Sequence, residues 1–115
     1  MKIKIKLSII NNENEPFMGI GLIWLLEKIK EHKSIRKAAA HMDMSYAKAH
    51  RILKNLEKNL GEKIIVTKIG GIERGGANLT PFGEEFINKY DEYQKKIKDY
   101  AEIEFIRFLE DIKKI

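Results

Sequence analysis

Residues 34–61 read SIRKAAAHMDMSYAKAHRILKNLEKNLG, and their apolar residues recur at the spacing of two short helices. Ser34 can cap the first helix, because a serine hydroxyl accepts a hydrogen bond from a free backbone N–H one turn into a helix. Three consecutive alanines favour a close approach by another helix. The apolar face of this first helix comprises Ile35, Ala38, Ala39 and Met42.

A second helix is predicted after a turn at Asp43 and Met44. Ser45 offers another N-cap, and Gly61 can end the helix in the left-handed conformation. The buried side is expected to comprise Ala49, Ile52, Leu53, Leu56 and Leu60. The outward side carries Tyr46, Lys48, His50, Arg51, Lys54 and Asn55. Two helices joined by a tight turn, the second one basic outside, are typical of a helix-turn-helix, which places its second helix in the major groove of DNA. The alternative is an ordinary helical hairpin with a solvated charged face.

Residues 63–79 predict a β-hairpin. Lys63–Lys68 (KIIVTK) is β-branched and strand-like, and Asn78 and Leu79 can form a return strand. Between them, residues 70–77 (GGIERGGA) hold two glycine pairs with Arg74 at the tip. A hairpin directly behind a basic second helix is the wing of a winged helix. The glycines lack the G-x-x-x-x-G-K-[ST] spacing of a nucleotide-binding loop, so that function is not favoured.

From about Gly19 to about Tyr90, the sequence resembles the DNA-binding domain of the molybdate-responsive ModE regulators and of their LysR-type relatives. The most specific matching parts are Ser45-Tyr46-x-Lys48-Ala49, at the start of the second helix, and the double-glycine hairpin that runs into Leu79-Thr80. The preceding Gly19-x-Gly21 and Leu25-Leu26-Glu27 match as well.

The resemblance implies a winged-helix transcription regulator that binds palindromic DNA as a dimer, with Tyr46, Lys48 and the wing at the DNA. The sequence departs from the ModE branch at His50, where that branch often has tryptophan, so base readout there is expected to differ. ModE regulators also carry molybdate-binding domains after the DNA-binding domain. This chain stops at Ile115, so we expect no small-molecule effector site, for molybdate or another ligand, within it.

Net charge divides the chain into two parts. Residues 1–80 hold 15 Lys and Arg against 8 Asp and Glu, a net charge of +7, whereas residues 81–115 hold 7 against 9, a net charge of −2. The basic excess therefore lies on the part expected to meet DNA, where neutralised phosphates supply sequence-independent affinity. A lysine-rich protein can also be basic for solubility alone.

Composition and spacing argue against several other classes. The 115 residues allow one small domain, and the absence of cysteine excludes disulfides and thiolate metal sites. No apolar run reaches membrane-spanning length and no signal peptide is visible, so we expect a cytoplasmic protein with no membrane partner. His32, His41 and His50 stand nine residues apart, which is not the spacing of a helical metal site. No convergent set of ionisable groups points to an enzyme, so we expect no catalytic residues, cofactor or metal.

The first 18 residues predict a β-strand or hairpin. Met1–Ile10 alternates lysines with isoleucine and leucine, the pattern of a half-buried strand with one charged face, and Glu15–Met18 can pair back after a turn. We interpret the lysines as protection of an edge strand, with a membrane-surface or nucleic-acid contact as the alternative. A helix from about Gly19 to His32 should follow, with Ile20, Ile23 and Trp24 on a second apolar side that fits either a partner subunit or deep burial.

Residues 81–115 predict one long helix, capped by Thr80 and with Pro81 in its first turn. Aromatic and aliphatic residues recur in steps of four and three, as in a coiled coil. About 30 residues of helix, roughly 45 Å, exceed what so small a domain covers. We therefore expect a homodimer, although the seam could instead fold back on its own N-terminal strand. The expected interface comprises Ile20, Trp24, Tyr90, Tyr93, Ile97, Tyr100 and Phe108.

Together these patterns predict a mainly α-helical chain with a small β component. Residues 1–80 form a winged helix-turn-helix, with the N-terminal strand or hairpin at 1–18, the helix-turn-helix at 34–61 and the wing at 63–79; residues 81–115 form the dimerisation helix. The predicted function is sequence-specific binding of double-stranded DNA in transcription regulation, and a winged-helix module for a protein partner is the alternative. The expected DNA contacts are Ser34, Arg36, Ser45, Tyr46, Lys48, His50, Arg51, Lys54 and Arg74.

Overall fold

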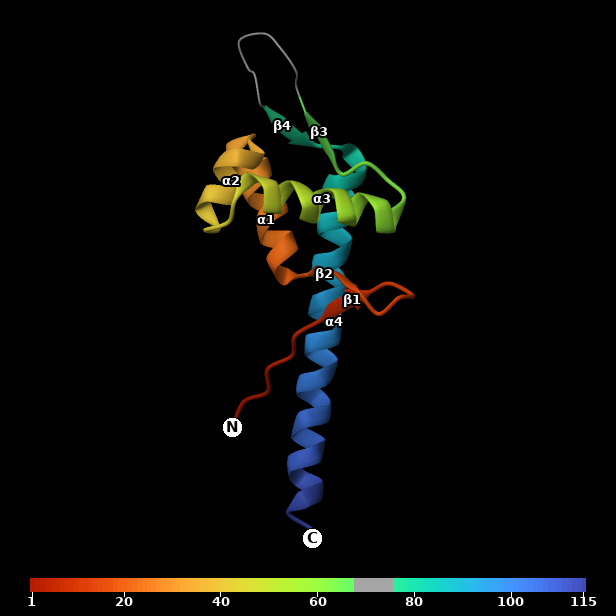
Figure 1. Ribbon diagram of the computed structural model, residues 1–115. Coiled ribbons are helices and arrows are strands. Elements are labelled where there is room, and N and C mark those ends of the chain that lie inside the picture. The colour runs from red at the N-terminus through yellow and green to blue at the C-terminus, as the bar shows by residue number, and fades with distance from the viewer. Residues whose placement is uncertain (68–75) are drawn as a thin grey trace.

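The helix-turn-helix expected at residues 34–61 is present and packs against the helix before it (Figure 1). In the computed structural model, which describes residues 1–67 and 76–115, α1 spans Ile20–His32, α2 spans Ile35–His41 and α3 spans Tyr46–Leu60. Both predicted serine caps form: Ser34 Oγ accepts a hydrogen bond from the N–H of Lys37, and Ser45 Oγ accepts one from that of Lys48, each at 3.1 Å. Gly61 ends α3 with a φ of 71°, the left-handed conformation predicted for it.

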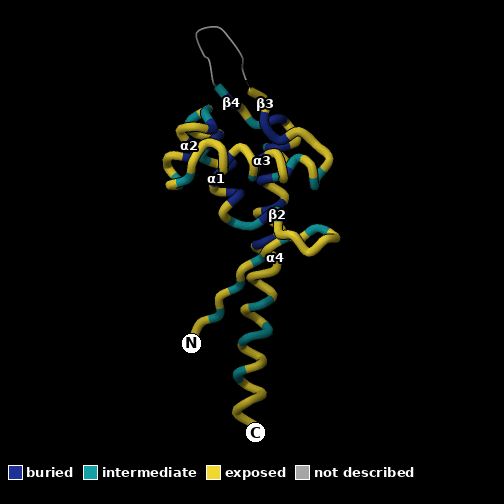
Figure 2. The backbone as a smooth tube through the Cα atoms, in the orientation of Figure 1, coloured by how far each residue is buried: buried dark blue, intermediate teal, exposed yellow. Residues whose placement is uncertain are grey.

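The hydrophobic core lies among these three helices and the start of the wing (Figure 2). Two of the three consecutive alanines, Ala38 and Ala39, are buried, and their small side chains let α2 lie close to its neighbours. The second apolar side of α1 is divided, because Ile23 is buried whereas Trp24 remains 54% exposed. The largest fully buried side chains are Ile23, Leu25, Leu26, Ile29, Leu56 and Ile64.

Two small antiparallel sheets flank the helices. β1 (Ser8–Ile10) pairs with β2 (Pro16–Gly19), and β3 (Ile65–Thr67) pairs with β4 (Ala77–Leu79). The second pair forms the base of the predicted wing. Its predicted tip at Arg74 lies outside the described residues.

The prediction of a strand from Met1 to Ile10 is wrong for the first seven residues, which belong to no sheet. The physical reason is the lack of a partner: Ser8 pairs with Gly19, and directly after Gly19 the chain enters α1. The predicted alternation persists without the sheet. Along this N-terminal segment, residues 1–7, the lysines are exposed and the isoleucines and leucine are half-buried.

The long helix α4 spans Pro81–Ile112 and extends away from the other helices (Figure 1). Thr80 caps it as predicted, with Oγ1 accepting the N–H of Gly83 at 3.0 Å. The molecule measures 68 × 28 × 25 Å because of this projection. The first turns of α4 pack on the core through Ile87, Tyr90 and Gln94, and no residue from 95 to 115 is buried (Figure 2).

Gly83 marks the closest approach of α4 to the wing. A Cβ atom at this position would lie 2.7 Å from the backbone oxygen of Ile64 and 3.2 Å from its Cγ2. The first distance is far below ordinary van der Waals contact, and the oxygen belongs to backbone that cannot move freely. Only glycine therefore fits here without displacing the chain.

We predict that Gly83→Ala lowers the free energy of unfolding by about 1–3 kcal/mol, because the added methyl group must push the Ile64 backbone away. Gly21 is a matched control, since it is also helical and a Cβ there meets nothing within 4 Å. Gly21→Ala should instead raise the free energy of unfolding by about 0.5–1 kcal/mol. Urea unfolding followed by circular dichroism measures both, and equal effects would contradict the proposed contact.

Candidate nucleic-acid interface

Helix α3 separates an apolar buried side from a polar exposed side. Ala49, Leu53 and Leu56 face the core. The predicted DNA-contacting residues of this helix all lie on the exposed side, namely Tyr46, Lys48, His50, Arg51 and Lys54. The two sides are about half a turn apart, so packing of the apolar side fixes the direction in which the polar side chains point.

Ala47 also belongs to this exposed side, and the sequence-based list of contacts omits it. Steps of four and seven residues place Ala47, Arg51 and Lys58 along one line of the helix, opposite the buried residues. The four-residue step from Ala47 to Arg51 is the signal that could have identified it. Its small side chain lets a partner approach the first turn of α3 closely.

The first turns of α2 and α3 lie beside each other. The guanidinium carbon of Arg36 lies 4.9 Å from the centre of the Tyr46 ring, within the range of a cation–π contact. The Tyr46 and His50 rings are 5.9 Å apart at an angle of 34°. These contacts bring the predicted residues of two helices together at one end of the site, next to the two serine caps.

Free backbone N–H groups also occur at the start of α3. The Ser45 cap uses the N–H of Lys48, and the carbonyl oxygen of Ser45 accepts the N–H of Ala49 at 3.1 Å. No hydrogen bond within the described residues uses the N–H groups of Tyr46 and Ala47. Such free groups, at the positive end of the helix dipole, suit an anion such as a phosphate.

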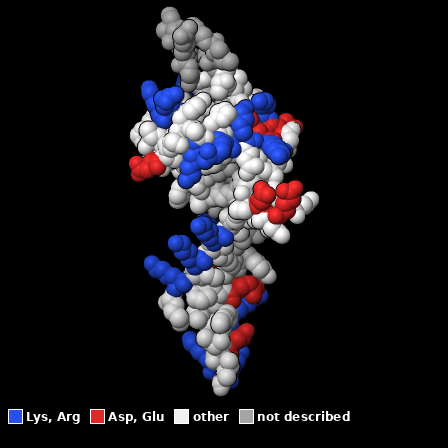
Figure 3. Space-filling model, viewed as in Figure 1, with Lys and Arg blue, Asp and Glu red and all other residues white. Residues whose placement is uncertain are grey.

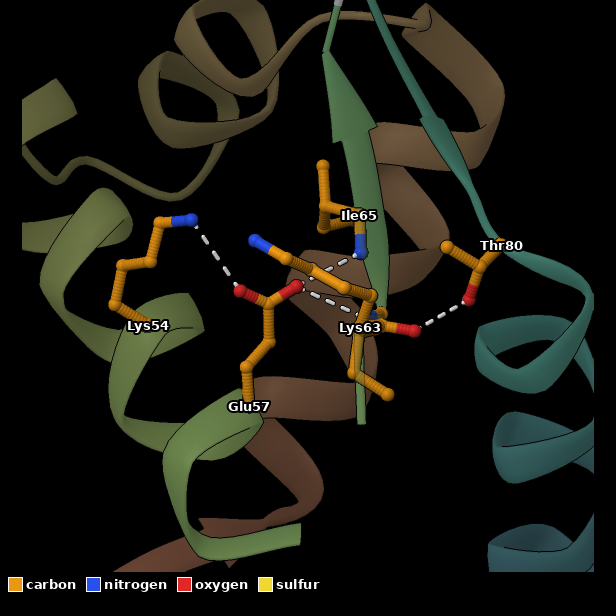
Figure 4. A network of polar contacts seen from close by, with 6 residues as sticks. Lys54, Glu57, Lys63, Ile65 and Thr80 are labelled. Carbon is orange, nitrogen blue, oxygen red and sulfur yellow. Dashed lines mark hydrogen bonds and ion pairs between the residues drawn. The ribbon is translucent and has the colours of Figure 1, made fainter. Parts of the chain in front are cut away.

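The wing is attached to α3 by the carboxylate of Glu57 (Figure 4). Its Oε2 accepts the backbone N–H of Ile64 at 2.8 Å and that of Ile65 at 3.2 Å. Its Oε1 lies 3.4 Å from the Nζ of Lys54. The Glu57 side chain is 10% exposed, so this ionised group depends on its partners for stabilisation.

The pKa of Glu57 reflects the balance among these contacts. Burial alone raises the pKa of this carboxyl, whereas the hydrogen bonds from Ile64 and Ile65 and the charge of Lys54 lower it. The lowering contributions prevail, so the pKa lies below its ordinary value of 4.5. The carboxylate therefore stays ionised at neutral pH and holds β3 against α3.

A second attachment holds the other strand of the wing. The backbone N–H of Ala77 donates to the carbonyl oxygen of Lys33 at 2.9 Å, and Ser34 forms a β-bridge with Gly76. Lys33 and Ser34 form the junction between α1 and α2. The base of the wing is thus joined both to the exposed helix and to the start of the helix-turn-helix.

Basic side chains gather over α2 and α3 on the face of the molecule shown in Figure 3. Lys54 has a double role there, because it pairs with Glu57 and is still 54% exposed. The structure therefore brings eight of the nine predicted DNA contacts to the helix-turn-helix, and the ninth, Arg74, lies outside the described residues.

The predicted dimer residues lie on or beside α4, and all of them except Tyr90 are at least partly exposed. Tyr93, Tyr100 and Phe108 are about half exposed, and Ile97 is 36% exposed. Tyr90 instead is 4% exposed and belongs to the protomer's own core. The half-buried Ile20 and the exposed Trp24 line a groove of about 640 Å³ between the N-terminal segment and α4.

Within residues 1–67 and 76–115, no group of three His, Cys, Asp or Glu side chains is placed to hold a metal ion. His32 and His41 do meet, with stacked rings 4.3 Å apart, a contact that their spacing of nine residues does not predict. No helix in the described ranges combines the length and apolarity needed to cross a membrane.

Comparison with known families decides the classification. The family model of the bacterial regulatory helix-turn-helix proteins of the LysR type matches residues 21–84. The chain belongs to the LysR family. The match begins in α1 and ends in the first turn of α4, so it contains the whole helix-turn-helix and wing.

Individual relatives agree with this classification. The molybdenum transport protein ModE of Azotobacter vinelandii is 31% identical over 84 residues, which is 70% of this chain and 31% of that protein. The present chain thus spans about a third of that relative's length. The resemblance to ModE and LysR-type regulators that the sequence predicted is confirmed.

Solved structures confirm the predicted fold class. The DNA-binding domain of CbnR, in a complex with DNA, has a TM-score of 0.58 at 18% identity and covers 74% of this chain and 92% of its own. The DNA-binding domain of BenM, bound to benA site 1 DNA, has a TM-score of 0.54 at 20% identity and covers 75% of this chain and 91% of its own. At this identity the likeness concerns the fold, a winged helix-turn-helix with a long C-terminal helix.

We predict that the stability supplied by Glu57 depends on pH. Because the folded pKa is lowered, the ionised carboxylate stabilises the fold above about pH 4.5, and this contribution disappears as the pH falls through the folded pKa. Glu57→Gln should lower the free energy of unfolding by about 1–2 kcal/mol near neutral pH. Its difference from the wild type should shrink as the solution is acidified.

Chemical unfolding at a series of pH values tests this. Glu62→Gln is the control, since Glu62 is exposed in the loop that follows α3. A Glu57→Gln variant with the same stability as the wild type at neutral pH would contradict the role assigned to the carboxylate.

Proposed function

We propose that this LysR-family chain is a transcription regulator that binds a two-fold symmetric site on double-stranded DNA as a homodimer. The observation that carries the proposal is the exposed basic side of α3, whose opposite side is buried and whose direction is fixed by the core and by the wing. A helix held in this way can enter the major groove of DNA. Bacterial DNA lies in the cytoplasm, so for a member of this bacterial regulatory family we also propose a cytoplasmic location.

Base readout is assigned to the middle of the exposed side. Lys48 and Arg51 are placed to donate to the O6 and N7 atoms of guanine, the commonest specific contact in the major groove. Tyr46 and His50 supply apolar contact or further hydrogen bonds. The methyl group of Ala47 suits the methyl group of thymine.

Phosphate contacts are assigned to the edges of the site. The free N–H groups at the start of α3, and those near Ser34 and Arg36 at the start of α2, face the negative backbone. Lys54 and Arg74 add positive charge on the side of the wing. These groups position the protein without reading sequence.

A protein partner in place of DNA is disfavoured by the composition of this face. Interfaces for protein partners are enriched in large apolar and aromatic side chains. Histidine apart, Tyr46 is the only large apolar or aromatic side chain exposed on α3. The apolar surface lies elsewhere, on α4, which supports its use in dimerisation.

The proposed dimer rests on the exposed apolar residues beyond the first turns of α4, together with Trp24 of α1. Trp24, Tyr93, Ile97, Tyr100 and Phe108 remain in contact with solvent in the single protomer. A second copy of α4 would cover them, as in a coiled coil. Two subunits related by a two-fold axis then require two half-sites about one or two helical turns apart.

We predict that Lys48→Ala and Arg51→Ala change the sequence preference of DNA binding, with a loss of about 1–3 kcal/mol at the base pairs they contact. Selection from a randomised duplex library, followed by titration of the preferred sites, measures both effects. Lys58→Ala is the control, because Lys58 lies near the far end of α3. It should weaken all sequences about equally. An unchanged preference in both variants would remove Lys48 and Arg51 as base readers.

We predict that Tyr100→Glu dissociates the dimer. A buried charge in an apolar helix interface lacks a partner, so the dimer Kd should rise at least about tenfold. Lys95→Glu is the control, because position 95 lies about 140° around the helix from position 100. Sedimentation velocity over a range of concentrations measures the change. A wild-type protein that stays monomeric at high concentration would contradict the dimer itself.

A further inference from the structure

The N-terminal segment carries a row of positive charge that the proposed DNA site does not use. Lys2, Lys4 and Lys6 are all exposed, and Ile3, Ile5 and Leu7 between them are half-buried. The apolar residues line the groove that also contains Trp24 of α1 and Gln94, Lys98 and Glu102 of α4, and Lys4 and Lys6 contribute to the same lining. In an extended chain, alternate side chains are about 6.6 Å apart, so the exposed lysines place three positive charges along a short stretch of chain.

No ion pair joins this charge to a neighbouring carboxylate, although Glu102 lines the same groove. Some lysines elsewhere in the described residues do form ion pairs, as Lys30 does with Glu84 and Lys89 does with Glu85 and Glu92. No such pair involves the row of three within residues 1–67 and 76–115. The first carboxylate along the chain is that of Glu13, in the loop between β1 and β2.

Protection of a sheet edge does not account for the row. The only strand in this part of the chain that pairs with β2 is β1, which begins at Ser8, after the last of these lysines. The three side chains therefore flank no ladder of strand hydrogen bonds that a neighbouring chain could extend. A partner that carries negative charge accounts better for three exposed lysines that form no ion pair.

The position of the row indicates which partner this is. Figure 3 shows Lys and Arg side chains gathered over the N-terminal segment on the same face of the molecule as those of α3. The segment lies against residues 94–102 of α4, well beyond the start of that helix at Pro81, where the wing joins it. For a two-fold axis that passes through the exposed apolar part of α4, residues 93–108, the row is nearer to this axis than α3 is.

We propose that Lys2, Lys4 and Lys6 bind phosphates of the DNA between the two half-sites. The proposal rests on the proposed function, because it needs a duplex held against α3. The two-fold axis brings two such rows to the centre of the site. They add sequence-independent affinity there, and they favour operators whose spacer keeps its backbone within reach of both rows.

The test measures the salt dependence of binding to a duplex of about 40 base pairs with random sequence. Each phosphate neutralised contributes about 0.9 to the slope of log affinity against log salt concentration. The triple variant with Lys2→Gln, Lys4→Gln and Lys6→Gln should lower the slope by about 2–3 per subunit. The triple arginine variant, which keeps the charges, should retain it.

A matched control separates local contact from net charge. Lys95→Gln, Lys96→Gln and Lys113→Gln together remove the same charge from the exposed surface of α4 and its end. This variant should keep the wild-type slope. If both triple glutamine variants lowered the slope equally, net charge would explain the effect and the proposal would be wrong. Thermal unfolding confirms that each variant is folded.

Other outcomes are equally distinct. Failure of the wild type to bind any duplex would overturn the proposed function and this inference together. If the wild type binds DNA and the variant with glutamine at positions 2, 4 and 6 keeps the same salt dependence, the inference alone is overturned. Sedimentation with vesicles that contain phosphatidylserine tests the membrane alternative. If the variant with glutamine at positions 2, 4 and 6 lost vesicle binding but kept DNA binding unchanged, the row would be assigned to a lipid surface instead.

Phosphate ethylation interference should map the contacts to the spacer of a selected site.

Discussion

The carboxylate of Glu57 joins α3 to the base of the wing, the two parts of the molecule that we propose meet DNA together. It is nearly buried, and its burial is offset because it satisfies the N–H groups of Ile64 and Ile65, two residues of the core. The same stretch of backbone then fixes α4. The carbonyl oxygen of Ile64 accepts the N–H of Thr80 at 2.9 Å, and that of Lys63 accepts the Thr80 hydroxyl at 2.6 Å. One chain of polar contacts thus sets both the wing and the direction of α4 relative to α3.

Much of the fold follows from local physics and could be predicted from the sequence. The caps at Ser34, Ser45 and Thr80 and the left-handed Gly61 depend on residues within a single turn, and all four are confirmed. The strand predicted for the first seven residues is wrong, because a strand needs a partner that the local pattern cannot supply. Tyr90 fits the seam of α4 by spacing, but its burial depends on where α4 meets the core.

The candidate site, like the fold, could be predicted from the sequence only in part. Helical period alone places Lys48 and Arg51 on the outward side of α3, so these residues could be identified without a structure. The role of Glu57 could not be, because it depends on backbone groups at the start of the wing, seven and eight positions further along the chain. The contact of Arg36 with Tyr46 likewise arises only when α2 and α3 pack. Sequence therefore identifies the groups that face outward, and tertiary contacts determine how rigidly they are held.

The N-terminal segment links the apolar and the charged surfaces of the protein. Its half-buried residues form part of the wall of the groove beside α4. A second copy of α4 that covers Trp24 and Tyr100 would also shield this groove from water. Dimerisation would then hold the lysine row more firmly at the centre of the DNA site. In this arrangement subunit association and electrostatic affinity reinforce each other, because the same segment contributes half-buried apolar residues to one and exposed lysines to the other.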